Sequence, residues 1–309
     1  MKILFMGTPE FARKSLEALV EDGSNEIVGV ISQPDKPKGR KMELSMPEVK
    51  VYALEKGLPV YQPETLKDNA ILPLLQELQP ELIVVVAYGK ILPEYVLSFP
   101  KYRCINIHAS LLPRFRGAAP IQRAVMAGDK VSGVTSMYLE KGLDTGDMIL
   151  KTEVPIEREM TASMLHDVLA EAGGRLLIDT VERFKRGDLS AEKQDDSLAT
   201  YAHMLTKAEG ELDWSLSAEE IYNKVRGLNS WPMAYSMLGG KRFVIDMVQI
   251  AEGTGSSGEI IAVDDSGLTV ACGSGAVKIE NVKFEGKSRM TVKDYLRGHR
   301  IEKGTIVGG

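Results

Sequence analysis

Short apolar runs alternate with helix-like stretches through the first half of the chain. The apolar runs are KILFM, EIVGVIS, LIVVVA and CINIH, and stretches of helical periodicity begin near Pro9 and Pro47. Several of these runs are apolar on both alternating faces, as expected of strands that helices cover on each side. The pattern predicts an α/β domain built on a mostly parallel sheet.

The pattern changes between residues 132 and 155. VTSMYLE and DMILKTEVP flank the glycine-rich segment KGLDTG, which predicts an antiparallel pair of strands around a functional loop. A long helix near residues 161–186 is predicted to close the domain.

A polar, unpatterned segment, RGDLSAEKQDDSLATYAHMLTK, separates this half from the rest. A helical stretch near residues 218–228 and five β-like runs punctuated by turns follow it, a spacing that suits a small antiparallel barrel such as an OB-fold. The predicted fold class is α/β, with a Rossmann-like mostly parallel sheet domain followed by a small OB-like β-barrel domain. The predicted boundaries are a catalytic domain at 1–188, a linker at 189–206 and the barrel domain at 207–309.

Composition narrows the class of protein. A chain of 309 residues with 44% hydrophobic residues favours two packed domains, and a net charge of −5 argues against a nonspecific nucleic-acid binder, though not against local basic patches. The longest apolar stretch, residues 82–87, is too short for a bilayer, and no signal-peptide pattern follows Met1, so we expect a cytoplasmic protein without a membrane partner. Cys104 and Cys272 lack the spacing of a disulfide framework or zinc site.

Three polar residues are placed where chemistry is expected. Asn106 and His108 are two positions apart on the CINIH strand, so their side chains share one face of it. Ligands of open α/β sheets bind beyond the carboxyl ends of the strands, which is where this strand ends. Asp144 lies in GLDTGD, where glycines allow the chain to bend sharply and present a carboxylate.

Each signal alone has an ordinary structural explanation. An Asn-X-His pair is often only a hydrogen-bonded strand end, and an Asp in a glycine-rich turn is often only a turn residue. Together, NIHASLLPRFRG followed by GLDTGD closely resembles the formyltetrahydrofolate-using transferases, and GAAPIQ is similar to their methionyl-tRNA formyltransferase branch. FMGTPEFA, SQPDKPKGR, VVAYGKILP and KVRGLNSWPMAY extend this resemblance over nearly the whole chain.

The resemblance implies an enzyme that transfers a formyl group from 10-formyltetrahydrofolate to the amino group of methionine on initiator tRNA, for translation initiation. It implies a catalytic triplet of Asn106, His108 and Asp144, and a folate site lined by Ser110, Leu111, Leu112 and Pro113. Chemically, amide and imidazole N–H groups can stabilise the oxyanion of the tetrahedral intermediate, and the carboxylate can orient the imidazole and relay protons. Folate is then a consumed substrate, and neither a metal nor a tightly bound cofactor is expected.

Basic residues suggest how tRNA is held. The loop QPDKPKGRKMELSMP carries Lys38, Arg40 and Lys41, and the resemblance implies that it orders against the acceptor end of tRNA. On charge alone, the loop also fits a solvated surface segment. Met42 to Leu44 replace lysines that the family often shows, which affects the finer contacts. The carboxy-terminal basic residues and the OB-like domain fit the tRNA body, and we expect a monomer.

Other functions fit less well. A formyltransferase acting on a glycinamide nucleotide or nucleotide sugar, or a formyltetrahydrofolate hydrolase, would share the triplet but needs neither the basic loop nor the second domain. A noncatalytic RNA-binding protein does not explain the complete triplet. A dinucleotide dehydrogenase is excluded because GTPEF lacks the G-x-G-x-x-G phosphate turn.

Overall fold

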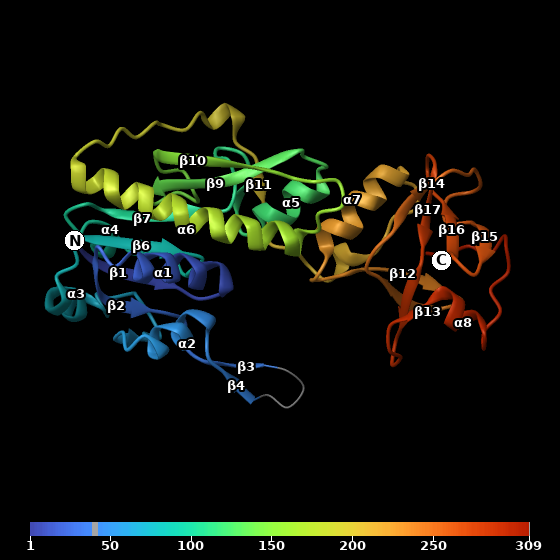
Figure 1. The fold of residues 1–309 in the computed structure, drawn as a ribbon, viewed down its shortest axis with the longest axis horizontal. Coiled ribbons are helices and arrows are strands. Elements are labelled where there is room, and N and C mark those ends of the chain that lie inside the picture. Colours follow the sequence, from blue (N-terminus) through green and yellow to red (C-terminus); the bar gives the residue numbers. More distant parts are fainter. Residues whose placement is uncertain (39–42, 309) are drawn as a thin grey trace. The chain divides into compact units, whose positions relative to one another are not determined.

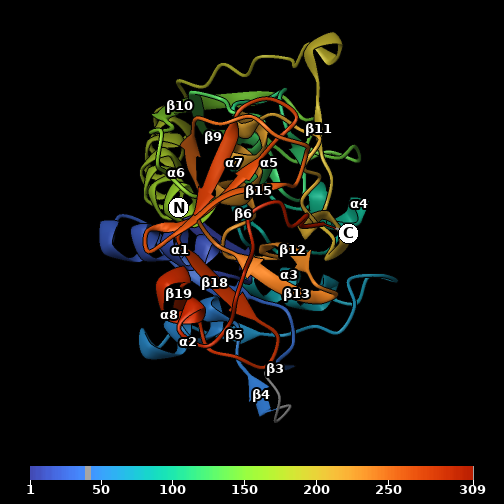
Figure 2. The same ribbon diagram turned by 90° about the vertical axis from the view of Figure 1, so that its right-hand side faces the viewer.

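The computed structural model describes residues 1–38 and 43–308. Contacts divide the chain into two compact units, shown as ribbons in Figure 1 and Figure 2. The first unit comprises Met1–Gly117, Val131–Pro155 and His166–Ala202, and the second comprises Ala118–Lys130, Ile156–Leu165 and His203–Gly309. Each unit is therefore assembled from segments that are separate in the sequence.

A seven-stranded sheet in the order β10-β9-β7-β6-β1-β2-β5 forms the centre of the first unit. Its strands are β1 (Lys2–Gly7), β2 (Glu26–Ile31), β5 (Val60–Tyr61), β6 (Leu82–Val86), β7 (Cys104–His108), β9 (Val131–Tyr138) and β10 (Met148–Pro155). The first five are parallel, whereas β9 runs antiparallel to β7 and β10 antiparallel to β9. The predicted mostly parallel sheet and the predicted antiparallel pair are both confirmed.

The central strands are hydrophobic because both faces of the sheet are covered. Every residue of β6 and β7 is buried, as the doubly apolar runs in the sequence indicated. The helices of this unit include α1 (Glu10–Asp22), α2 (Glu48–Glu55), α3 (Leu72–Leu78), α4 (Glu94–Leu97) and most of α6 (Ala162–Arg186). α1 follows Pro9 and ends at Gly23, whose φ of 64° suits glycine.

Helices α1 and α6 pack side by side (Figure 1), and glycine makes this possible. A Cβ at Gly174 would lie 3.0 Å from the Cβ of Ala18, and one at Gly173 would lie 3.1 Å from Ile107 of β7. Small residues at these two positions let the helix backbone approach both its neighbour and the sheet. No helix in the described part of the chain has the length and apolar character needed to cross a membrane.

Two short strand pairs lie outside the seven-stranded sheet. β3 (Lys36–Lys38) and β4 (Glu43–Ser45) form an antiparallel pair, which lies within the predicted basic loop. β8 (Arg116–Gly117) pairs in parallel with β11 (Tyr201–Ala202), and the 3-10 helix η1 (Asp196–Leu198) precedes β11. The second pair joins the segment after the NIHASLLPRF motif to a segment more than eighty residues later.

The second unit combines helices with two four-stranded sheets, in the orders β12-β13-β18-β19 and β14-β17-β16-β15. The strands are β12 (Ala234–Leu238), β13 (Lys241–Ile245), β14 (Gln249–Ala251), β15 (Ile260–Asp264), β16 (Gly267–Ala271), β17 (Ala276–Ile279), β18 (Asn281–Phe284) and β19 (Met290–Thr291). The helices are α5 (Pro120–Met126), α7 (Ala218–Leu228), α8 (Val292–Leu296) and the 3-10 helix η2 (Ala208–Gly210). Side chains of α7 and the strands share one hydrophobic core.

Two of the five predicted apolar runs each split into two strands. Residues 241–250 form β13 and then β14, and residues 275–284 form β17 and then β18. In both runs the chain leaves one sheet and enters the other. A mainly antiparallel, strand-rich second unit is therefore present, with shorter strands than the hydrophobic runs suggested.

Candidate active site

Strand β7 carries Asn106 at its middle and His108 at its carboxyl end. Asn106 aligns with Val85 of β6 and Met137 of β9, while His108 lies opposite Thr135 of β9. The two side chains are buried, with 9% and 6% of their surfaces exposed. Their shared face is a consequence of strand geometry, and neighbouring strands on both sides fix it.

The His108 ring is oriented by two groups from different loops. Its Nε2 lies 2.9 Å from the carbonyl oxygen of Phe115, and its Nδ1 lies 3.6 Å from Oδ2 of Asp144. A carbonyl can only accept a hydrogen bond, so Nε2 carries the proton in this arrangement. The other ring nitrogen, Nδ1, faces the Asp144 carboxylate.

Asp144 lies in the loop between β9 and β10, and a backbone group from another segment binds its carboxylate. The backbone N–H of Gly117 donates to Oδ2 at 2.7 Å, a charge-assisted contact that fixes the carboxylate. Asp144 itself has a φ of 52°, a conformation that non-glycine residues rarely adopt. At Gly146 there is no room for a side chain, because a Cβ would collide with the carbonyl oxygen of Tyr138.

Asn106 differs from its two neighbours because its carboxamide is unengaged. Within the described residues, no protein group hydrogen-bonds to this side chain, although it is almost completely buried. Its amide atoms are not among the fully buried, unpaired side-chain atoms of the described residues, so solvent still reaches them. An accessible, unengaged carboxamide on the strand face that carries His108 is available to bind a substrate atom.

The predicted folate residues lie in the turn that follows β7. Ser110 donates from Oγ to the carbonyl of Arg114 at 2.6 Å, and Thr135 donates to the carbonyl of Ser110 at 2.7 Å. The N–H of Leu112 donates to the same Thr135 hydroxyl at 3.1 Å. Ser110 and Leu112 are each 1% exposed, whereas Leu111 and Pro113 keep part of their surface accessible. The turn thus leaves two of its four side chains partly accessible.

Sequence reasoning missed two buried polar residues beside the triplet. Arg116 is 2% exposed and Gln194 is 5% exposed, and the Nε of Arg116 donates to Oε1 of Gln194 at 3.0 Å. Arg116 also forms an ion pair with Asp196 at 2.7 Å. Gln194 comes from the polar stretch interpreted as a linker, in which the sequence pattern singles out no residue. The run of arginines in PRFRG was the one available signal for Arg116.

The predicted tRNA loop is described only in part. Lys38 ends β3, while Arg40 and Lys41 lie outside the described residues. The base of this loop is closed by Lys50 of α2, which contacts both carboxylate oxygens of Asp35 at 2.8 and 2.9 Å. Gln62 donates to Asp35 and accepts from Lys50, so the two ends of the loop are tied together.

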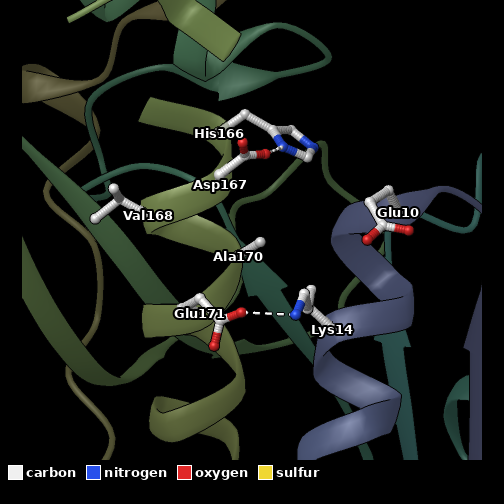
Figure 3. A pocket seen from close by; sticks show the side chains of 7 residues that line it. All are labelled: Glu10, Lys14, His166, Asp167, Val168, Ala170 and Glu171. Atoms are coloured by element: carbon white, nitrogen blue, oxygen red, sulfur yellow. Dashed lines mark hydrogen bonds and ion pairs between the residues drawn. The ribbon is translucent and has the colours of Figure 1, made fainter. Parts of the chain in front are cut away.

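A surface hollow between α1 and α6 contains none of the predicted site residues (Figure 3). It is lined by Glu10, Lys14, His166, Asp167, Val168, Ala170 and Glu171. An ion pair of 2.8 Å between Lys14 and Glu171 crosses it, and Nδ1 of His166 lies 3.0 Å from Asp167. In the part of the chain that the structure describes, no group of histidine, cysteine or acidic residues is arranged to hold a metal ion.

Both halves of this chain are similar in sequence to known proteins. The Formyl transferase family matches residues 1–181, and the family described as Formyl transferase, C-terminal domain, matches residues 204–300. A methionyl-tRNA formyltransferase of Citrifermentans bemidjiense is 46% identical over 308 residues, covering 100% of this chain and 96% of the relative. That of Clostridium acetobutylicum is 47% identical over 310 residues, covering 99% of each chain.

A solved structure shares the fold. The N-formyltransferase of Helicobacter canadensis, in complex with folinic acid and dTDP-3-aminofucose, has a TM-score of 0.68 and 18% identity, covering 90% of this chain and 98% of its own. At that identity, the likeness shows the fold alone. The family matches and full-length relatives show that this chain belongs to the methionyl-tRNA formyltransferase family, and is a formyltransferase enzyme.

Proposed function

We propose that Asn106, His108 and Asp144 are the catalytic residues with which this chain formylates the methionyl group of initiator tRNA, using 10-formyltetrahydrofolate as the donor. The observation that carries the proposal is the close approach of the Asp144 carboxylate to the His108 ring, whose strand face also carries Asn106. His108 lies 3.6 Å from the Asp144 carboxylate, and a buried carboxamide without a protein partner among the described residues lies two residues earlier on the same strand face. This combination supplies an oxyanion donor and a proton relay in one place.

The reaction divides between these groups. The neutral α-amine of the methionyl ester attacks the formyl carbon, the carbonyl oxygen becomes negative, and the bond from carbon to N10 of the folate then breaks. Asn106 donates an N–H to the oxyanion, a contribution of about 3–4 kcal/mol in comparable sites. Nε2–H of His108 is engaged by Phe115 in this conformation, so Asn106 is the available oxyanion donor.

Proton transfer is assigned to His108 and Asp144. The amine loses one proton as the new C–N bond forms, and N10 of the folate gains one as it leaves, so the reaction needs no net acid or base. Nδ1 of His108 faces the carboxylate that Gly117 holds, and this pair can accept the first proton and deliver the second.

The turn from Ser110 to Pro113 is proposed as the folate wall. Leu111 and Pro113 offer accessible apolar surface, whereas the side chains of Ser110 and Leu112 face inward and hold the turn in shape through Thr135. The folate is a substrate that enters and leaves in each cycle.

Basic segments are proposed to bind the tRNA. Lys38, Arg40 and Lys41 would contact the acceptor end, and the ion pair of Asp35 and Lys50 lies close in sequence to the paired strands β3 and β4. For the second unit we propose an OB-like barrel, because two of its apolar runs continue from one antiparallel sheet into the other, as strands do at barrel corners. We further propose that the protein acts as a monomer in the cytoplasm.

One assay tests the proposed function. The protein is incubated with 10-formyltetrahydrofolate and, separately, with charged initiator tRNA, charged elongator methionine tRNA or glycinamide ribonucleotide. Formylation of the initiator tRNA is expected, with much weaker use of the elongator tRNA. Formylation of glycinamide ribonucleotide alone would contradict the proposal.

A further inference from the structure

A buried amide, that of Gln194, lies between the two loops that form the candidate active site. Gln194 is 5% exposed, although Lys193 before it and Asp195 after it are both exposed. In a polar segment without helix or strand at this position, such burial needs a specific reason. The reason is found in the hydrogen bonds of its side chain.

The Gln194 amide is fully used in joining the loops. Its Nε2 donates to the carbonyl oxygens of Asp144 and Gly146, both at 2.8 Å. Its Oε1 accepts from Nε of Arg116 at 3.0 Å. One side chain thus binds the backbone on both sides of Thr145 and, at its other end, the residue that follows Phe115.

Arg116 is itself fixed, so it anchors the amide. Its guanidinium pairs with Asp196, and its backbone N–H donates to the carbonyl of Thr200 at 2.8 Å. The residues on either side of it take part in the site, because the Phe115 carbonyl orients His108 and the Gly117 N–H binds the Asp144 carboxylate. The Arg116 end of the bridge is therefore linked through the backbone to the groups that orient the His108 ring and the Asp144 carboxylate.

The other end of the bridge holds an uncommon backbone conformation. Asp144 has a φ of 52°, in the left-handed region that non-glycine residues occupy only where their surroundings impose it. The loop is also bound at Met148, whose backbone exchanges two hydrogen bonds of 2.8 Å with Glu192. Gln194 is the side chain that fixes the Asp144 carbonyl, and with it the direction of the carboxylate.

We propose that Gln194 is a positioning residue for formyl transfer, which holds the Asp144 carboxylate in register with His108 by bridging the Asp144 and Gly146 carbonyls to Arg116. The inference rests on the proposed function of the triplet. The amide N–H groups of Gln194 bind the backbone of the loop that carries Asp144, so Gln194 acts through Asp144. Loss of its two donors should leave substrate binding almost unchanged and slow the chemical step, because misplacement by about 1 Å can reduce rates about 10²-fold.

The test compares Gln194→Met, which keeps the side chain's length without donors, with Gln194→Glu, which keeps an acceptor for Arg116 but loses the amide N–H groups. Lys193→Ala is the matched control on an exposed neighbour. Both Gln194 variants should lower kcat on charged initiator tRNA by about 10²-fold, with KM for tRNA and folate within about threefold of wild type. The kcat–pH profile should also shift, because the carboxylate no longer faces the imidazole in the same way, and hydrogen exchange at the Gly117 amide should accelerate.

The outcomes separate this inference from the proposed function. A wild-type protein that formylates initiator tRNA, together with a folded Gln194→Met or Gln194→Glu variant of unchanged kcat and pH profile, would overturn the positioning role alone. A variant that loses thermal stability but keeps wild-type kcat per folded molecule would also overturn it, since it would show a purely structural role. A wild-type protein that formylates no tRNA would overturn the proposed function, and this inference with it.

Discussion

The strand that carries Asn106 and His108 and the loop that carries Asp144 are positioned by different forces. β7 is buried along its whole length and is bonded through its backbone to β6 and β9. The loop is held by a few polar contacts, from Gly117, Gln194 and Glu192. Geometry on the strand is therefore tied to the stability of the whole sheet, whereas geometry in the loop depends on a small number of polar contacts. Activity and stability should respond separately to changes in the two regions.

The loop should show the largest effect on chemistry. Asp144→Asn keeps an oxygen that can accept from Gly117 but removes the negative charge facing His108. We expect kcat to fall about 10³-fold or more, as in other sites where an imidazole loses its carboxylate, with unfolding free energy changed by less than about 1 kcal/mol. Single-turnover formylation and urea denaturation measure the two quantities.

Glu140→Gln provides a matched loss of charge close to the same loop. Glu140 forms an exposed ion pair with Arg103, so its removal should change neither kcat nor stability by much. If Asp144→Asn reduced kcat no more than this control does, the proposed role of Asp144 would be wrong.

On the strand, Asn106→Ala should lower kcat by about 10²–10³-fold, because the oxyanion loses a prearranged donor. The carboxamide has no protein partner among the described residues, so its removal should change the unfolding free energy by less than about 1 kcal/mol. Asn106→Asp, of the same shape, replaces a donor with a charge that repels the oxyanion and should be at least as damaging. Thermal unfolding measures the stability of both variants, and steady-state kinetics measure their activity. Wild-type activity in Asn106→Asp would contradict the proposed role of Asn106.

A neighbour on β7 should behave in the opposite way. Ile105 is fully buried, and Ile105→Ala leaves a cavity that should lower the unfolding free energy by about 2–5 kcal/mol. The backbone bonds to β6 and β9 persist, so kcat per folded molecule should fall less than about tenfold. Urea denaturation combined with active-site titration tests this, and a large loss of kcat without loss of stability would remove the distinction between the regions.

The loop counterpart is Gly146→Ala. The added Cβ would meet the carbonyl oxygen of Tyr138, so the loop must shift, and kcat should fall about tenfold with a stability loss of about 1–2 kcal/mol. Gly298→Ala is the control, because that glycine has open space around it and no positive φ. Equal losses in both variants would indicate a general cost of replacing glycine.

Local sequence patterns predicted β7 and its neighbouring strands well. Apolar runs identified β1, β6 and β7, and the two-residue period of an extended strand was enough to put Asn106 and His108 on one face. Asp144 was found through its flanking glycines and the family motif. Its contact with His108 depends on tertiary structure, which spacing alone does not define.

Local patterns failed where polar residues are buried by distant partners. Gln194 belongs to a segment whose polar, unpatterned sequence is typical of an interdomain linker, yet it is buried, and its amide donates to backbone carbonyls about fifty residues earlier. The bends that divide residues 241–250 and 275–284 between two sheets were missed for a related reason. Continuous hydrophobicity reports burial, and it does not report the sheet in which each half pairs.

Cysteine reactivity measures how readily β7 and the Asp144 loop open in the native protein. Burial on β7 raises the pKa of the Cys104 thiol to about 12, and burial also raises the pKa of the Cys272 thiol to about 11. Both thiols are therefore protonated and inaccessible at pH 8, and a thiol reagent should react with native protein only as fast as the structure opens. Leu143, in the loop, is 60% exposed, so Leu143→Cys should react within minutes while Cys104 in the same molecule does not. Mass spectrometry of the labelled peptides gives both rates, and equal rates would mean that β7 opens as readily as the loop.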